Sequence, residues 1–237
     1  MTSSPSIIDS HIHLWPESAA NNEAHEWMNS GFILAKEHVL QDYYRAANQE
    51  PENITGPKVR GVIYIETDRR YGERGDQELH RWAMQPTEEI RFLRSMVEGQ
   101  YGERDAKMLL GLVPWAPVDQ GIAVFEAWLT HAEQTAGPEV WERVRGFRFL
   151  LQAITDRKQF ENLVFSKDFI SILKSFRGKT RNFSFDVGVD QHSGGVWQLE
   201  AFAKVIQQVH ADAAENEKVI FILSTCTIRI RSLSTSY

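Results

Sequence analysis

The sequence predicts an α/β protein built on a parallel β-sheet. Short runs rich in β-branched and aromatic residues alternate with longer stretches whose apolar residues recur every three or four positions, a pattern typical of repeated strand–helix units. The first predicted strand leads into His13-Leu14-Trp15-Pro16, where an open doubly wound sheet would have a glycine-rich phosphate-binding turn. The two observations together favour a (β/α)8 barrel, the TIM barrel, with its chemistry at the carboxyl ends of the strands.

The predicted elements follow one another in a regular order. Runs of Val, Ile, Leu, Phe and Tyr predict strands at residues 6–14, 59–67, 108–116, 144–151, 183–189 and 218–223. Apolar residues at helical spacing predict helices at 34–48, 76–99, 120–135, 159–176 and 196–213. The last helix has the clearest pattern, because its first turn follows the Gly194-Gly195 pair and one face carries Val196, Leu199, Phe202, Ala203, Ile206 and Val209.

The chain is short for a complete barrel. Eight strand–helix units take about 250 residues, whereas this chain of 237 residues reaches the end of its sixth strand at residue 223. We therefore expect an incomplete barrel over residues 6–223, with about six strands present and the last two βα units missing. Residues 224–237 contain seven Ser or Thr and form an atypical tail.

A second interpretation of the tail remains open. Residues 227–231 alternate between polar and apolar side chains, which is also typical of an edge strand. With or without that strand, the sheet keeps an exposed parallel edge, and self-association through this edge is expected.

Composition excludes several classes of function. The chain has 32 acidic and 26 basic residues, a formal net charge of −6, which speaks against nucleic acid or an acidic membrane surface as a partner. No apolar run approaches the roughly 20 residues that span a bilayer. The single cysteine, Cys226, cannot form an internal disulfide, and the first residues lack the features of a signal peptide. We expect a cytoplasmic protein that acts on a small molecule.

The first strand carries the densest chemistry. Side chains alternate along a strand, so Asp9, His11 and His13 share one face while Ile8, Ile12 and Leu14 face the helices. Two imidazoles on one face can bind one divalent metal, zinc in the first instance, and Asp9 can orient a ligand. We expect the other histidines, at positions 25, 38, 80, 131 and 210, to be surface or packing residues.

Further polar residues stand near the carboxyl ends of later strands. Glu66 ends the second strand, and Arg148 lies between two phenylalanines in the fourth. A buried Arg needs an anion, so Arg148 either contacts a substrate carboxylate or oxyanion, or forms a structural ion pair with a carboxylate of the protein. In and after the fifth strand Asp186, Asp190 and His192 can bind substrate hydroxyls, although such loop residues are also common turn formers.

These segments resemble a known family. The first strand is similar to the opening of the amidohydrolase superfamily, in its amidohydrolase-related (amidohydrolase 2) branch of sugar-lactone and aromatic-lactone hydrolases. Further similar segments are Gly111–Trp115, Val144–Arg148, Phe185–Asp190 and the Ser193-Gly194-Gly195 turn. The runs at 25–44 and 190–197 resemble rhamnono-lactonase-like proteins most. The resemblance implies a TIM barrel, opening of a sugar-acid or related lactone by an activated water, and His11 and His13 as metal or substrate ligands.

The chain also departs from the family pattern. Family members continue after the sixth strand with an Asn-His or Asp-His segment, and an Asp after the eighth strand acts as the general base. This chain has no His beyond His210 and no Asp beyond Asp212. We therefore expect impaired catalysis and weak metal retention. The alternatives are a non-catalytic barrel remnant that binds a ligand or partner, and a metal-assisted decarboxylase on the same fold.

Overall fold

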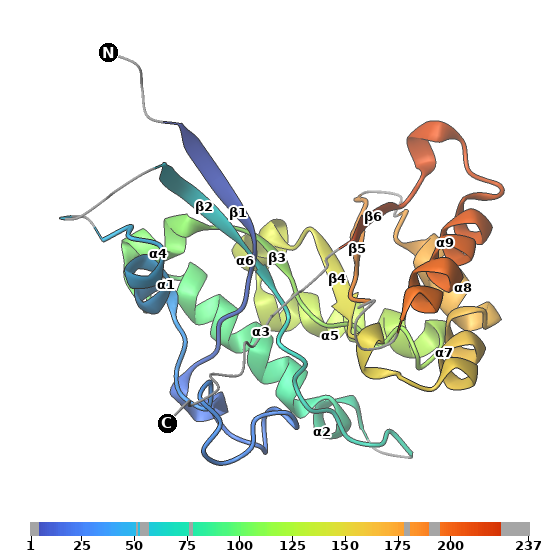
Figure 1. The fold of residues 1–237 in the computed structure, drawn as a ribbon, viewed down its shortest axis with the longest axis horizontal. Helices are drawn as coiled ribbons and strands as arrows, with labels where there is room; N and C mark the ends of the chain where they lie inside the picture. Colours follow the sequence, from blue (N-terminus) through green and yellow to red (C-terminus); the bar gives the residue numbers. More distant parts are fainter. Residues whose placement is uncertain are drawn as a thin grey trace, which may run out of the picture.

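A computed structural model describes residues 5–50, 52, 57–75, 78–177, 181–189 and 195–223 (Figure 1). Its six strands are β1 (Ser6–Ile12), β2 (Lys58–Ile65), β3 (Leu109–Val113), β4 (Gly146–Phe149), β5 (Ser184–Val187) and β6 (Ile220–Leu223). Each strand lies where the sequence predicts one, which confirms all six positions. Residues 224–237, the predicted tail, lie outside the described residues.

The strands form two parallel three-stranded sheets, β1-β2-β3 and β4-β5-β6. Two isolated parallel bridges, Leu112 with Val144 and Trp115 with Arg148, connect β3 to β4. All six strands therefore follow one another in chain order, as the strands of a (β/α) barrel wall do. The parallel α/β class is confirmed. The described strands form no closed ring, so the barrel and its two missing units stay predictions.

Helices separate consecutive strands (Figure 1). They are α1 (Leu40–Ala46), α2 (Leu79–Trp82), α3 (Met84–Val97), α4 (Glu103–Met108), α5 (Ile122–Ala136), α6 (Pro138–Arg143), α7 (Arg157–Val164), α8 (Lys167–Ser175) and α9 (Val196–His210). Short 3-10 turns lie at Glu17–Ala19, Leu151–Ala153 and Glu215–Glu217. None of the described helices is both long enough and apolar enough to cross a membrane.

Every predicted helical stretch contains a helix, but two of them divide. The stretch at 159–176 becomes α7 and α8 because Ser166 caps a new helix, its Oγ accepting a hydrogen bond from the Phe169 amide at 3.2 Å. The stretch at 76–99 similarly contains α2 and α3. The short helices α4 and α6 are not predicted. Each follows a glycine with positive φ, at Gly102 and Gly137, where hydrophobic periodicity gives too few positions to count.

The predicted buried face of α9 is shifted. Phe202 and Val209 are buried as predicted, whereas Val196 is 58% exposed and Ala203 is also exposed. The buried stripe instead consists of Gln198, Ala201, Phe202, Val205 and Val209. Gln198 lies in it because its amide donates to the Ile154 carbonyl at 3.0 Å, a partner that hydropathy does not reveal.

The core lies where the helices pack against the sheets. In the second sheet Phe185 of β5 stacks on Phe202 of α9, with ring centroids 5.9 Å apart, and also contacts Phe176. Phe125 of α5 stacks on Phe176 from the other side. These rings join α5, α8 and α9 through one continuous apolar layer.

The two outer strands expose apolar side chains. Ile8 on β1 is 56% exposed and Ile220 on β6 is 62% exposed. Ile8 was expected to face the helices with Ile12 and Leu14; those two are buried, but Ile8 is not. Ile7 is also 47% exposed, so the first residues of β1 are exposed on both faces, and the pairing with β2 shifts register between Ile7 and Ile8 as well as between Asp9 and Ile12. Self-association through these edges stays a prediction.

Gly146 provides a test of the second sheet. A Cβ at this position would overlap the backbone carbonyl of its β5 partner, Ser184. We expect Gly146→Ala to lower the free energy of unfolding by about 2–3 kcal/mol, because the strands must move apart. Gly72→Ala is the matched control, since the nearest atom to its Cβ is 3.7 Å away. Urea unfolding measures both, and equal midpoints for the two variants would contradict the tight β4–β5 contact.

Candidate active site

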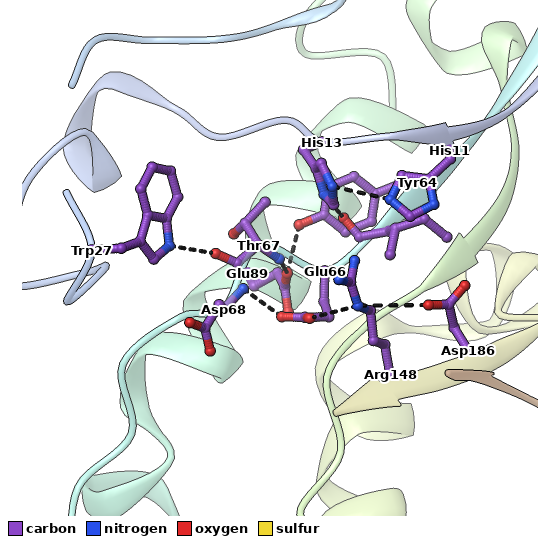
Figure 2. Close-up of polar contacts among 11 residues, drawn as sticks. His11, His13, Trp27, Tyr64, Glu66, Thr67, Asp68, Glu89, Arg148 and Asp186 are labelled. Carbon is purple, nitrogen blue, oxygen red and sulfur yellow. Dashed lines mark hydrogen bonds and ion pairs between the residues drawn. The ribbon is translucent and has the colours of Figure 1, made fainter. Parts of the chain in front are cut away.

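Five of the predicted site residues come together near the carboxyl ends of four strands. His11 and His13 come from β1 and the residue after it, Glu66 follows β2, Arg148 lies in β4 and Asp186 in β5 (Figure 2). Asp190 and His192 belong to residues 190–194, outside the described residues, so their predicted roles stay predictions.

The two imidazoles of β1 contact each other. The Nε2 atoms of His11 and His13 are 3.1 Å apart, although the strand alternation is interrupted between Asp9 and Ile12. Asp9 holds this irregular segment: its Oδ1 accepts from the His11 amide at 3.2 Å and its Oδ2 from the Tyr43 hydroxyl at 3.1 Å. Asp9 thus contacts the backbone of this segment, and its role in orienting a ligand stays a prediction.

Hydrogen bonding defines the tautomer of His13. Its Nδ1 lies 3.0 Å from the Ile65 carbonyl, which can only accept, so Nδ1 carries the proton and Nε2 presents its lone pair to His11. Burial lowers the pKa of His13 to about 4, and the charge of Arg148 makes the second largest contribution. Burial and then Arg148 also lower the pKa of His11. Both rings are therefore neutral at pH 7, the form in which imidazole binds a metal.

The pair fits two ligand positions of one divalent metal. Two nitrogens bound tetrahedrally to zinc at 2.0–2.1 Å lie about 3.3 Å from each other, close to the 3.1 Å observed. A catalytic zinc site needs three protein ligands. No group of three His, Cys, Asp or Glu side chains with metal-binding geometry occurs among the described residues. They supply part of such a site.

Arg148 lies between two buried carboxylates. Its Nε is 3.4 Å from Glu66 Oε1 and 3.6 Å from Asp186 Oδ1, and all three side chains are at most 4% exposed (Figure 2). Of the two roles open for Arg148, the structural ion pair is therefore formed. Burial raises the pKa of Glu66, and the neighbouring charge of Arg148 opposes this rise and favours the carboxylate. Gly188 makes the room, because a Cβ there would lie 2.9 Å from Arg148 Nε.

Asp68 joins the cluster and was not predicted. Its amide donates to Glu66 Oε2, and its backbone has a φ of 56°, a left-handed conformation that is uncommon for a residue other than glycine. Burial raises the pKa of its carboxyl to about 6. Strained residues with shifted pKa values gather at functional sites. The sequence signal was the polar run of residues 66–70 directly after a buried strand.

A cavity of about 620 Å³ adjoins this cluster at Asp68. Its walls come from the segments that follow β2, β3 and β4, the end of a parallel sheet where ligands bind. The lining includes Asp68, Arg69, Tyr71, Trp115, Asp119 and Phe149. Acidic, basic and aromatic groups thus surround one space, which meets the Arg148 cluster at Asp68.

The loop that carries Asp68 is braced from the N-terminal side. His25 is fully buried; its Nδ1 donates to the Ala19 carbonyl and its Nε2 accepts from Thr67 Oγ1, both at 2.8 Å. Trp27 Nε1 donates to the Thr67 carbonyl at 3.1 Å (Figure 2). Glu89 Oε1 accepts from the Thr67 amide at 3.3 Å. Thr67 is therefore held on three sides, and His25 has the packing role that the sequence predicts.

Comparisons with known proteins find a relative by sequence and several solved structures with a similar fold. No family model matches the chain. An L-rhamnono-gamma-lactonase from Scheffersomyces stipitis is 28% identical over 212 residues, which cover 86% of this chain. The chain spans 57% of the length of that relative.

The solved structures show the same fold. An amidohydrolase 2 from Bifidobacterium longum subsp. infantis superimposes with a TM-score of 0.53 at 18% identity, covering 93% of this chain and 61% of that chain. An amidohydrolase from Burkholderia multivorans with bound Zn gives 0.52 at 19% identity, covering 84% of this chain and 54% of that one.

His25 predicts a pH-dependent stability. Burial and the charge of Arg69 lower its pKa from 6.5 to about 4, so between these values the unfolded chain takes up a proton that the folded chain does not. This contribution is complete above pH 6.5 and is lost as the pH falls toward 4. We expect unfolding free energies to fall more steeply for the wild type than for His25→Gln, by up to about 3 kcal/mol over this window.

The comparison isolates His25, because the other titrating groups are common to both proteins. His80→Gln, which replaces an exposed histidine, should follow the wild type. Urea unfolding at half-unit pH intervals measures the slopes. Parallel curves for the wild type and His25→Gln would show that His25 is not held neutral in the folded protein.

Proposed function

We propose that this chain, whose predicted resemblance to amidohydrolase-type, lactonase-like proteins is confirmed by its curated relative and by its structural neighbours, carries the site of a hydrolase that opens a sugar-acid or related lactone. One observation carries the proposal: the histidine pair, Arg148, Glu66 and Asp186 meet near the carboxyl ends of parallel strands. Asp68, which is hydrogen-bonded to Glu66, connects this cluster to a cavity. The barrel domain is proposed to extend over residues 6–223.

The histidine pair is proposed to hold a divalent metal. His11 and His13 are neutral and present adjacent Nε2 atoms, which suits zinc. When bound, such a metal supplies Lewis acidity toward the lactone carbonyl. The single N–H of His13, on Nδ1, donates to the Ile65 carbonyl and keeps the ring in this orientation.

Arg148 is proposed to contact a neutral part of the substrate. Glu66 and Asp186 already compensate its charge, so a lactone carbonyl or hydroxyl is a better partner than a further carboxylate. Glu66 and Asp186 then hold the guanidinium in place and accept hydrogen bonds from hydroxyl groups of the substrate. The same hydroxyl contacts are proposed for Asp190 and His192.

Asp68 is the described carboxylate best suited to take a proton from water. It lines the cavity, and a pKa of about 6 leaves it ionised at pH 7.5 yet basic enough to accept a proton. As water oxygen bonds to the carbonyl carbon, its proton passes to Asp68. The ring C–O bond then breaks, and the proton goes to the departing alkoxide, giving the hydroxy acid.

A second candidate is a ligand-binding protein without turnover. It is supported by the histidine pair, which has no third metal ligand among the described residues. Slow catalysis by the 237-residue chain stays the expectation from its sequence, which has no His beyond His210 and no Asp beyond Asp212.

Hydrolysis of a panel of aldonolactones tests the proposal. We expect saturable turnover at about 0.1 s⁻¹ or below, roughly 10²-fold under a typical enzyme, because the metal site is incomplete in the described part. Asp68→Asn should lower that rate by about another 10²-fold. Asp212→Asn is the control, since Asp212 is exposed and pairs with Lys174.

The outcomes separate the candidates. Hydrolysis that does not exceed the spontaneous rate contradicts the enzyme and supports the binding protein. Turnover near 10 s⁻¹ contradicts the impairment. Equal rates for Asp68→Asn and Asp212→Asn remove Asp68 from the mechanism.

Metal binding is tested separately from activity. We expect zinc, titrated against a chromophoric chelator at pH 7.5, to bind the wild type weakly and to bind His11→Ala/His13→Ala at least tenfold more weakly still. His80→Ala, on the exposed surface, should match the wild type. The histidine pair is not a metal site if the double variant retains wild-type affinity.

A further inference from the structure

Arg69 is a buried cation without a close partner. It is 2% exposed, and neither its Nε nor its Nη2 makes a hydrogen bond to the described residues. Among those residues no carboxylate forms an ion pair with it. The charge of Glu89 acts on Arg69 from beyond ion-pair distance: Glu89 Oε1 accepts hydrogen bonds from Tyr64 and Thr67, and Oε2 has no hydrogen-bond partner among the described residues. Burying a guanidinium without a direct partner costs several kcal/mol, so such a group is expected to have a ligand.

Arg69 borders the cavity described above. Arg69 lines the 620 Å³ cavity together with Trp115, whose side chain is also 2% exposed and whose Nε1 has no hydrogen-bond partner in the described part. Arg69 and Trp115 therefore border one cavity, and each has buried N–H donors without an acceptor among the described residues. A carboxylate, with two acceptor oxygens, is the small group that satisfies a guanidinium fork and an indole N–H together.

The rest of the cavity suits a hydroxylated carbon chain. Asp119 lines it, and Asp119 Oδ1 lacks a hydrogen-bond partner among the described residues, so it is available to accept from a hydroxyl. The Tyr71 ring lies against Trp115, with centroids 4.9 Å apart, and forms an aromatic wall with Phe149. Aromatic faces pack against the C–H groups of such a chain.

The two neighbouring arginines do not fit this role. Arg148 is compensated by Glu66 and Asp186, at 3.4 and 3.6 Å. Arg70 lines the same cavity, but its side chain is 44% exposed and it lies 3.8 Å from Glu26. Water and Glu26 therefore stabilise Arg70, and Arg69 alone of the three is both buried and without an ion pair in the described residues.

We infer that this cavity binds a small polyhydroxylated carboxylic acid, with its carboxylate on Arg69 and Trp115 Nε1 and a hydroxyl on Asp119. This inference rests on the proposed function, because such an acid is what opening of a sugar-acid lactone releases. Arg69 is thereby a product-binding residue, distinct from the histidine pair and from Arg148.

Calorimetric titration of the whole chain tests the inference with D-gluconate as the probe. Sorbitol, a neutral polyol of the same carbon number, and sulfate, an anion without hydroxyls on carbon, are the comparison ligands. We expect gluconate to bind at least tenfold more tightly than either. Arg69→Met should lose this preference, whereas Arg45→Met, which replaces an exposed arginine outside the cavity, should change gluconate affinity less than twofold.

A second variant tests the inference independently, in case Arg69→Met does not fold. Trp115→Phe keeps the ring and removes the N–H, and we expect it to weaken gluconate binding at least threefold with sorbitol unaffected. Equal binding of gluconate and sorbitol by the wild type, sulfate binding as tight as gluconate, or undiminished gluconate affinity in a folded Arg69→Met protein overturns the inference.

The test is independent of catalysis. Lactone hydrolysis without a preference for gluconate would overturn only the acid-binding role of Arg69. Gluconate binding through Arg69 without any hydrolysis would instead overturn the proposed function.

Discussion

The buried contact of Arg148 with Glu66 and Asp186 is the constraint on which the site depends. Arg148 belongs to β4, Glu66 follows β2 in the first sheet, and Asp186 belongs to β5 in the second. One guanidinium therefore joins the two sheets electrostatically at the point where only isolated bridges join them through the backbone. Removing a partner would leave a buried charge uncompensated, which is costly in a region of low dielectric. The same charge acts on the neighbouring imidazoles, whose pKa values it helps to lower.

The two buried arginines divide the chemistry between them. Arg148 is compensated inside the protein and contributes a fixed field around the histidine pair. Arg69, four residues after the end of β2, keeps donors that the described side chains do not use. A lactone is neutral and its hydrolysis product is an anion, so a site that handles both needs one environment for each. Of these two guanidinium groups, Arg148 is enclosed by carboxylates, whereas Arg69 borders the cavity.

The sequence was sufficient to predict the positions of the strands and most residues of the candidate active site. Alternation of side chains is a local property, so the strand positions and the convergence of His11, His13, Glu66, Arg148 and Asp186 could be predicted from residue order. It could not reveal Asp68 or Arg69, because their importance lies in a positive φ and in the absence of close partners. Both are tertiary properties. The shifted face of α9 has the same origin, since Gln198 is buried by a hydrogen bond to a residue 44 positions away.

The hydrogen bonds that hold Thr67 also fix the wall of the cavity to which a ligand would bind. His25, Trp27 and Glu89 hold this residue from three directions, and none of these contacts involves a bound molecule. The wall that carries Asp68 and Arg69 is therefore pre-organised: it adopts its shape before a ligand arrives. Ligand binding then costs less conformational entropy, because no loop has to become ordered. Fewer polar contacts are therefore needed for the same binding affinity.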